Sequence, residues 1–477
     1  MNRPTLTLLG ALLALPAAGA AQQFPTTPPT LGAAPTVTPP VPVQRQLANG
    51  MKVLYVRQPE LPVVSAALVV RGAGTTQDPS ALPGLASFTA SMLDEGAAGK
   101  NALQIADALD LLGASLSTGA NWDAATANLY VLKKNFPAAL GILADVVMRP
   151  DFNPSDLQRV RDERITNLTR ARDEPTAIAG NAFQSLVYGA RHPYGRFATV
   201  EATRTLDRDR VAAFHRAAYR PENATLILVG DVDPAALQPA VERAFGAWRA
   251  TGAAPAPEGS LDAPQIGTTT IFLVDKPGAA QSEIRIGHPG VARSTPDYFA
   301  LQVLNTLLGG AFTSRLNMNL RETHGWTYGA RSGFSMRQGA GPFTAQAGVV
   351  TAATDSSLVE FFKELNRIRT EPIPAEELEK AKRYVALGFP QSLETTQDVA
   401  GNLSNLVTYG IDPSWLGSYV RGVMGVSADD VRRVADRYVR PGNAVVVVVG
   451  DRSKIEAGIR ALNLGTVEVK DVGEFVR

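Results

Sequence analysis

Two phrases of the sequence match each other and divide the chain into halves. Tyr219–Asp231 reads YRPENATLILVGD, and Tyr438–Asp451 reads YVRPGNAVVVVVGD. Both contain Arg-Pro-x-Asn-Ala, a run of apolar residues, and Gly-Asp. Their last glycines, Gly230 and Gly450, lie 220 positions apart (450 − 230). A run of this kind between turn residues is typical of a buried strand. The chain therefore contains an internal structural repeat.

Each half begins with two expected strands, which are Lys52–Val56 and Val63–Val70 in the first half and Thr270–Val274 and Ser282–Gly287 in the second. Periodicity and turn residues predict a hairpin at Ser115–Leu132 and helices at Gln104–Gly113, Phe136–Met148 and Asn153–Arg172. Because this order lacks the regular strand and helix rhythm of a parallel sheet, we predict an α+β fold. It contains two homologous domains, each an antiparallel-rich mixed sheet with helices packed on one face.

The segments outside the domains are recognised by composition. Residues 1–21 combine Arg3, a short apolar run and a small-residue end, as in a secretory signal peptide. Residues 22–44 are rich in Pro and Thr and are expected to form an extended tether. Residues 251–267 have no apolar periodicity and are expected to link domains at 45–250 and 268–477. We expect a secreted or periplasmic protein with no integral membrane segment once the signal is removed, because the apolar run is shorter than the ~20 residues that span a bilayer.

Composition excludes several classes of function. The chain has 46 Lys and Arg against 45 Asp and Glu, so no net field favours nucleic acid or an anionic membrane surface. It contains no cysteine. Disulfides, thiolate metal sites and cysteine nucleophiles are therefore excluded.

The stretch GLASFTASMLDEG, residues 84–96, opens the helical part of the first half. As a helix it places Leu85 and Phe88 on one side, and Ser87, Ala90 and Ser91 on the other. The spacing i, i+3, i+4 is one at which metal ligands often share a helix face. In this chain the face carries only small side chains.

The order of these segments resembles the pitrilysin/insulinase family of zinc peptidases, and within it the mitochondrial processing peptidases and their bacterial relatives. The resemblance rests on the tether, the paired strands, GLASFTASMLDEG, the long charged helix, HPYGR at 192–196, RPENATLILVGD and the second, degenerate copy. It covers nearly all of the chain after the tether. It implies a two-domain chain that forms half of a clamshell around a peptide.

Active members of this family carry H-x-x-E-H on the first-domain helix, where two histidines bind zinc and the glutamate activates water. A further glutamate on a downstream helix is the third ligand. Aligned through its flanks, this chain has Ser87 and Ser91 at the histidine positions and Ala90 at the position of the base. Counting back from residues 173–175 places the third ligand position at Asn167. Because two hydroxyls and an amide do not match the ligands of a catalytic zinc site, we expect no metal in this chain.

A relocated metal or nucleophile site is also disfavoured. The four histidines, which are His192, His215, His288 and His324, lie at least 23 positions apart, so no two share a helical turn. We expect His192 to bond backbone in a loop, and His215 to lie on a helix face. Neither Ser87 nor Ser91 has a histidine within one turn to act as its base, so both are interpreted as packing residues.

The second half retains a different part of the family's active site. Residues 308–334 read LGGAFTSRLNMNLRETHGWTYGARSGF, which predicts a helix ending at Gly325 and a strand from Trp326. Arg321 and Tyr328 stand in the frame R-E-x-x-G-x-x-Y, which resembles the substrate-binding pair of the family's second domain. By resemblance, Arg321 holds the substrate backbone and Tyr328 donates to the scissile carbonyl or its oxyanion. The glycine-rich residues 308–310 are not expected to form a phosphate-binding loop, since no Gly-Lys-Ser/Thr follows. Their expected roles are flexibility and close packing.

Three functions remain open. The first is the non-catalytic subunit of a heterodimeric peptidase, in which a zinc-bearing homologue supplies the metal and this chain supplies Arg321 and Tyr328. The second is a self-associating peptide-binding or assembly protein that forms a homodimer. The third is an independent hydrolase with a different mechanism, which would have to cleave peptides alone and without metal.

Overall fold

The first half folds around a six-stranded mixed sheet with the order β1-β2-β8-β3-β7-β6. Its strands are β1 (Val43–Gln46), β2 (Lys52–Arg57), β3 (Val63–Arg71), β6 (Ser115–Ala120), β7 (Ala124–Leu132) and β8 (Ala224–Gly230). β2 and β8 are parallel, and the other neighbouring pairs are antiparallel. The expected hairpin is confirmed as β6 and β7.

The second half repeats this sheet in the order β11-β12-β10-β13-β9-β14. Its strands are β9 (Thr270–Asp275), β10 (Gln281–Pro289), β11 (Thr327–Phe334), β12 (Pro342–Val350), β13 (Val445–Gly450) and β14 (Thr466–Lys470). β9 and β13 are parallel, as β2 and β8 are. The sheets differ at one edge, where β1 is antiparallel to its neighbour and β14 is parallel.

The structure describes residues 38–255 and 258–476. The expected signal peptide, residues 1–21, and the first part of the expected tether lie outside them. The tether's last residues, Val43 and Gln44, belong to β1 and pair with Tyr55 and Leu54. The described residues belong to one compact unit.

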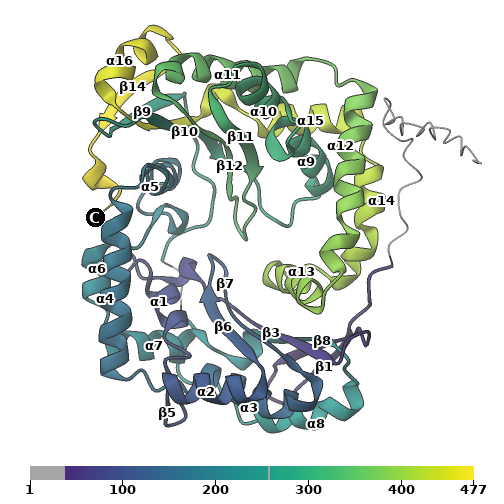
Figure 1. Ribbon diagram of the computed structural model, residues 1–477. Helices are drawn as coiled ribbons and strands as arrows, with labels where there is room; N and C mark the ends of the chain where they lie inside the picture. The colour runs from purple at the N-terminus through teal and green to yellow at the C-terminus, as the bar shows by residue number, and fades with distance from the viewer. Residues whose placement is uncertain (1–37, 256–257, 477) are drawn as a thin grey trace, which may run out of the picture. The chain divides into compact units, whose positions relative to one another are not determined.

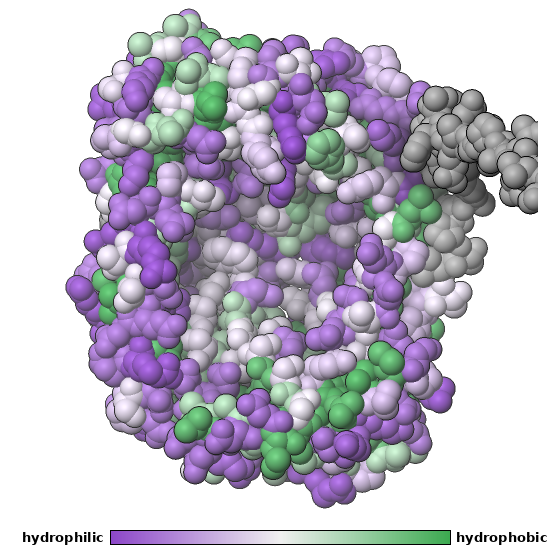
Figure 2. Space-filling model, in the orientation of Figure 1, coloured by the Kyte–Doolittle hydropathy of each residue, from purple (hydrophilic) through white to green (hydrophobic). Residues whose placement is uncertain are grey.

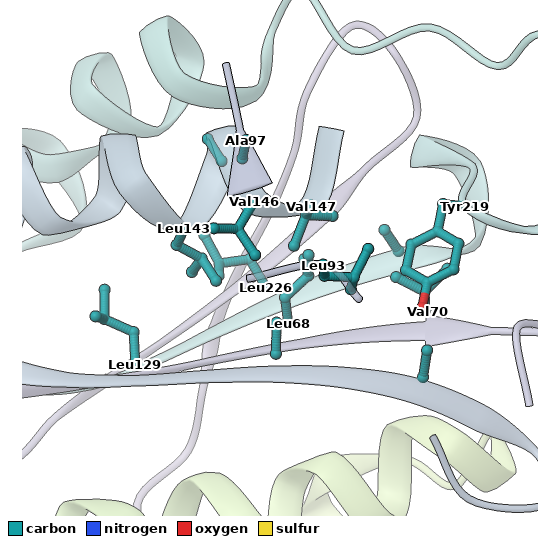
Figure 3. Close-up of a cluster of buried hydrophobic side chains, with 14 of the residues drawn as sticks. Leu68, Val70, Leu93, Ala97, Leu129, Leu143, Val146, Val147, Tyr219 and Leu226 are labelled. Carbon is teal, nitrogen blue, oxygen red and sulfur yellow. The ribbon is translucent and has the colours of Figure 1, made fainter. Parts of the chain in front are cut away.

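Helices cover one face of each sheet or flank the sheet at its side (Figure 1). In the first half they are α1 (Leu85–Ser91), α2 (Ala102–Leu112), α3 (Phe136–Met148), α4 (Pro154–Ala171), α6 (Val200–Arg204), α7 (Arg208–Ala218) and α8 (Pro234–Phe245). In the second half they are α9 (Tyr298–Asn305), α10 (Arg315–Asn317), α11 (Thr354–Thr370), α12 (Ala375–Gly388), α14 (Tyr419–Met424), α15 (Ala428–Tyr438) and α16 (Arg452–Ala461). Figure 3 shows Leu68, Leu129 and Leu226 of the first sheet facing Leu143 and Val146 of α3.

The other face of each sheet receives one helix from the opposite half. Helix α5 (Pro175–Tyr188) packs on the second sheet, and α13 (Thr396–Tyr409) packs on the first (Figure 1). Their first residues lie 221 positions apart (396 − 175), so the two helices are equivalent in the repeat. The two halves thus exchange one helix each.

This exchange explains why the repeated strands, β8 and β13, are buried at every position. In β13, Val446 and Val448 face the second half's own helices, while Val445, Val447 and Val449 face α5. Side chains alternate between the faces of a strand, so a strand covered on both sides is apolar throughout. The predicted α+β fold of two homologous domains is confirmed, and the structure adds one helix on the second face of each sheet.

Helix bounds follow local sequence signals closely in the first half. α3 has the expected bounds, and α4 lies between the caps Asn153 and Arg172. α1 is shorter than the quoted stretch, because it ends at Ser91 and a turn follows. The expected helix before Gly325 is divided into α10 and a π-helical segment, Met318–Thr323.

Candidate functional site

Helix α1 is held by a buried carboxylate. Asp78, which is 3% exposed, accepts hydrogen bonds from the backbone N–H groups of Gly84 at 2.6 Å and Ala86 at 2.7 Å. Burial raises the pKa of Asp78 to about 7, against the opposing effect of these hydrogen bonds and of Arg164 and Arg196. The carboxyl group therefore fixes the start of the helix that carries the degenerate motif.

The two serines of the motif are bonded into the helix that carries them. Ser87 Oγ donates to Gly84 O at 3.0 Å, and Ser91 Oγ donates to Phe88 O at 2.9 Å. Ala90 is fully buried. No carboxylate or imidazole stands at any of these three positions, so they offer neither zinc ligands nor a base for water.

An arginine occupies the space in front of Ser87. Arg164 of α4 donates from Nη2 to Ser87 Oγ at 2.8 Å, and its guanidinium lies 5.8 Å from the centre of the Phe88 ring. Asn167, three residues later on α4, is exposed. The structure thus places Arg164, rather than Asn167, against the degenerate motif.

Gly84 makes room for this arginine. Its φ is +95°, and a Cβ there would lie 2.7 Å from Arg164 Nη2 and 2.8 Å from Ala198 Cβ. The sequence analysis missed Asp78 and Arg164. No sequence pattern pointed to Asp78. Arg164 could not be distinguished in the sequence from the surface arginines of the same helix.

A cavity of about 290 Å³ adjoins this position and is lined in part by Asp78, Ser87, Trp122, Arg164 and Arg196. Because its wall carries two guanidinium groups and one carboxyl group, it does not match the ligand set of a zinc ion. Within residues 38–255 and 258–476, no three His, Asp or Glu side chains are placed to hold a metal ion.

Each of the four histidines has a local partner in the structure. His192 Nδ1 accepts from the backbone N–H of Tyr194 at 3.0 Å, in the loop where it was expected. His215 bonds Val147 O through Nε2, and His324 stacks on Trp326. His288 is buried between Pro289 O and the backbone N–H of Arg440.

In the second half, the structure brings Arg321 and Tyr328 together. The Arg321 guanidinium lies 5.0 Å from the centre of the Tyr328 ring and 4.7 Å from that of Phe312. Tyr328 is 88% exposed and Phe312 is 56% exposed. Arg321 also pairs with Glu322 at 3.2 Å. The arginine is therefore fixed between two rings while the phenol faces open space.

Two irregular backbone segments present this pair. Arg321 lies in the π-helical segment Met318–Thr323, and Tyr328 lies where the register of β11 against β12 shifts, between Thr327 and Ala330. Both irregularities are frequent at functional sites, and a bulge changes the direction in which a side chain points. Tyr328 is thereby presented at the edge of the sheet.

Asn317 joins these segments. Its Nδ2 donates to Phe312 O at 2.7 Å, and its Oδ1 accepts from the backbone N–H of Ala330 at 3.2 Å. The glycine-rich turn is close-packed, as expected, because a Cβ on Gly309 would lie 2.2 Å from Ser332 N. Phe312 and Asn317 were missed because their roles depend on contacts between segments distant in sequence.

Two family models match the chain. Residues 52–192 match the insulinase family, peptidase family M16, and residues 205–385 match the model described as the peptidase M16 inactive domain. Together these matches span more than half of the chain.

The chain is also similar to known proteins over most of its length. It is 24% identical over 426 residues to an uncharacterized zinc protease of Mycobacterium tuberculosis, covering 88% of this chain and 96% of that protein. It is 25% identical over 352 residues to an uncharacterized zinc protease of Bacillus subtilis, covering 73% and 83%.

Among solved structures, a peptidase M16 inactive domain from Pseudomonas fluorescens superposes with a TM-score of 0.80 at 28% identity, covering 86% of this chain and 97% of that one. A protease from Helicobacter pylori shares the fold, with a TM-score of 0.79 at 20% identity over 86% of this chain and 99% of that one. With the repeat, the degenerate motif and these matches, the chain belongs to the insulinase family of peptidases, peptidase family M16, as a member that lacks the zinc motif.

Proposed function

We propose that this chain is the non-catalytic subunit of a secreted or periplasmic heterodimeric zinc peptidase. It pairs with a homologue that carries the zinc motif and acts with it on peptides or unfolded segments. Arg321 and Tyr328 bind the substrate, and the partner supplies the zinc and the base. Two observations carry the proposal. Arg321 and Tyr328 contact each other in the second domain, and the first domain has no zinc ligands at the positions of the motif.

The first domain supports the non-catalytic role through charge as well as through ligand loss. Arg164 holds a guanidinium against Ser87, the position that the resemblance to the family assigns to a zinc ligand. A fixed cation repels a dication at close range. Restoring catalysis would therefore require more than restoring the ligands.

The second domain supports a substrate-binding role. Arginine offers a planar fork of donors for carbonyl or carboxylate oxygens, and a phenol can stabilise a developing oxyanion. Stacking between Phe312 and Tyr328 restricts the Arg321 side chain before any substrate arrives. An ordered side chain loses less entropy on binding.

Export is part of the same proposal, on the evidence of the sequence. An apolar run within residues 1–21 is followed by small residues, as in a cleaved signal. Among the described residues, no helix has both the length and the apolar character needed to cross a membrane.

The test mixes the purified chain with a homologue that carries the zinc motif. We expect the chain alone to hold no stoichiometric zinc and to cleave no peptide. The mixture should hold zinc and cleave peptides. Arg321→Ala with Tyr328→Phe should lower hydrolysis by the mixture at least tenfold, since a lost oxyanion donor costs about 3 kcal/mol. Arg331→Ala, at an exposed position of the same strand, is the matched control.

Three results contradict the proposal. These are full activity of the double variant in the mixture, robust cleavage by the metal-stripped chain alone, and a native homodimer that associates with no zinc-bearing homologue. The last result would favour an assembly protein.

A further inference from the structure

A second cavity, of about 750 Å³, lies in the second half, away from the degenerate motif. It is lined by the end of β11, Arg293 and one side of α9, one side of α13 and the start of α14. Aromatic and polar side chains share its wall, among them Arg293, Tyr298, Gln302, Asn405, Trp415 and Tyr419. Neither Arg321 nor Tyr328 lines it.

Arg293 is a buried cation on this wall. It is 6% exposed, and its guanidinium lies 3.9 Å from the centre of the Tyr298 ring and 4.6 Å from that of Trp415. Its backbone N–H bonds Arg337 O. In the part of the chain that the structure describes, the guanidinium has no salt bridge and no hydrogen bond.

The charges around Arg293 leave it uncompensated. Burial lowers its pKa, and the groups that act against this are the phenols of Tyr298, Tyr409 and Tyr419, which are neutral at ordinary pH. Asp398 also lines the cavity, but its carboxylate accepts from the backbone N–H and the hydroxyl of Thr395 in a capping box. Among residues 38–255 and 258–476, no carboxylate is therefore placed to neutralise the arginine.

An unpaired buried charge is costly, and buried arginines normally have acidic partners. Stacking on two rings recovers part of this cost but leaves the N–H groups at the edge of the guanidinium without acceptors. We propose that this cavity is a binding subsite for a carboxylate of a peptide, either an acidic side chain or the free C-terminus, which pairs with Arg293.

The chemistry of the wall favours this ligand class. A guanidinium matches a carboxylate in two parallel hydrogen bonds. One unpaired cation matches one monoanion. Gln302 and Asn405 bring amides that can bond peptide groups, and the volume is within the usual range for a ligand site. The inference deepens the proposed function and rests on it, because it names a chemical feature of the peptide that the chain takes.

Calorimetric titration of the full chain, without a partner, tests the subsite. Three acetyl-capped five-residue peptides serve as probes. The first is penta-alanine with a free C-terminus. The second and third end in a C-terminal amide and have Glu and Gln, respectively, in place of the central alanine. We expect at least one carboxylate probe to bind about tenfold or more tightly than the Gln amide, as for a charge-assisted pair. Which of the two binds identifies the source of the carboxylate.

Variants separate binding from folding. Arg293→Met keeps an apolar side chain between the rings and should remove the preference for carboxylate, with a melting temperature at or above the wild-type value. Arg293→Lys keeps the charge without the fork and should bind with intermediate affinity. Arg432→Met, at an exposed position of α15, should change neither property.

Equal binding of the three probes, or no binding of any, overturns the subsite. So does an Arg293→Met chain that melts lower and retains the carboxylate preference, because Arg293 would then have a purely structural role. These outcomes are distinct from a failure of the proposed function, which is measured by hydrolysis in the mixture and by the Arg321 and Tyr328 variants.

Discussion

Arg164 should weaken zinc binding even when the missing histidines are restored. The perturbation is Ser87→His with Ser91→His, compared with the same pair plus Arg164→Glu. Ala90 stays unchanged, because it is fully buried and the family's base at this position is not a ligand. Arg164 Nη2 lies 2.8 Å from Ser87 Oγ, so its guanidinium occupies the space that a histidine ring at position 87 would enter. A zinc ion bound about 2 Å from the ring nitrogen is taken to lie on the order of 5 Å from the guanidinium.

The repulsion can be estimated from this separation. A dication and a cation about 5 Å apart repel by ~7 kcal/mol at an effective dielectric constant of about 20. Movement of the Arg164 side chain lowers this value. If about a fifth of this repulsion energy remains, zinc affinity falls about tenfold. Arg164→Glu replaces the repulsion by a third ligand, so we expect the triple variant to bind zinc at least about 100-fold more tightly than the double variant.

The assay is competition with a chromophoric chelator, supported by metal analysis of the dialysed proteins. The matched control adds Asn167→Glu, in place of Arg164→Glu, to the histidine pair. Because Asn167 is exposed, this carboxylate should give no comparable gain. Equal zinc affinity of the double and triple variants, or an equal gain from Asn167→Glu, would refute the assignment of Arg164 to the site.

Three further predictions concern stability. Gly309→Ala should cost about 1–3 kcal/mol in urea unfolding, because its Cβ would collide with Ser332 N, whereas Gly333→Ala, with open space around its Cβ, should cost less than 1. Burial lowers the pKa of His288 to about 4, so its contribution to stability is complete above pH 6.5 and is lost as pH falls toward 4, about 3 kcal/mol in all. A plot of unfolding free energy against pH should therefore be flatter on its acid side for His288→Gln. Leu403→Ala in α13 should cost about 2–5 kcal/mol and loosen the first sheet's second face, as measured by hydrogen exchange in β3 and β8.

The sequence predicts elements whose signals are local. Helix α3 and the caps of α4 follow from apolar periodicity and from the Asn153-Pro154 start. The repeat follows from the matching strand phrases. Each of these signals lies within a few residues of the element that it specifies, so no knowledge of distant contacts is required.

The exchange of α5 and α13 depends on contacts between segments that lie from about 90 to more than 300 positions apart in the sequence. Ile178 and Phe183 pack on β13, and Leu403 and Leu406 pack on the first sheet. An amphipathic helix shows that it has a buried face, but not which sheet covers that face. One clue was present, since uninterrupted apolar strands imply cover on both sides.

The residue of α4 that faces α1 shows why a site residue cannot be assigned reliably by counting positions along the sequence. Three residues along an α-helix correspond to a rotation of about 300° and a rise of about 4.5 Å, so an alignment that errs by three positions keeps the side of the helix but moves the site residue almost one turn along its axis. Asn167 and Arg164 differ by that amount, and only Arg164 touches Ser87. The chemical conclusion changes with the position, because an amide would leave the former metal site neutral, whereas a guanidinium makes it cationic. A chain that had lost only its ligands could bind zinc again after a few substitutions, but one that holds a cation there must also lose the arginine. We therefore expect the charge of Arg164, as well as the absence of donors, to keep metal ions out of the first domain.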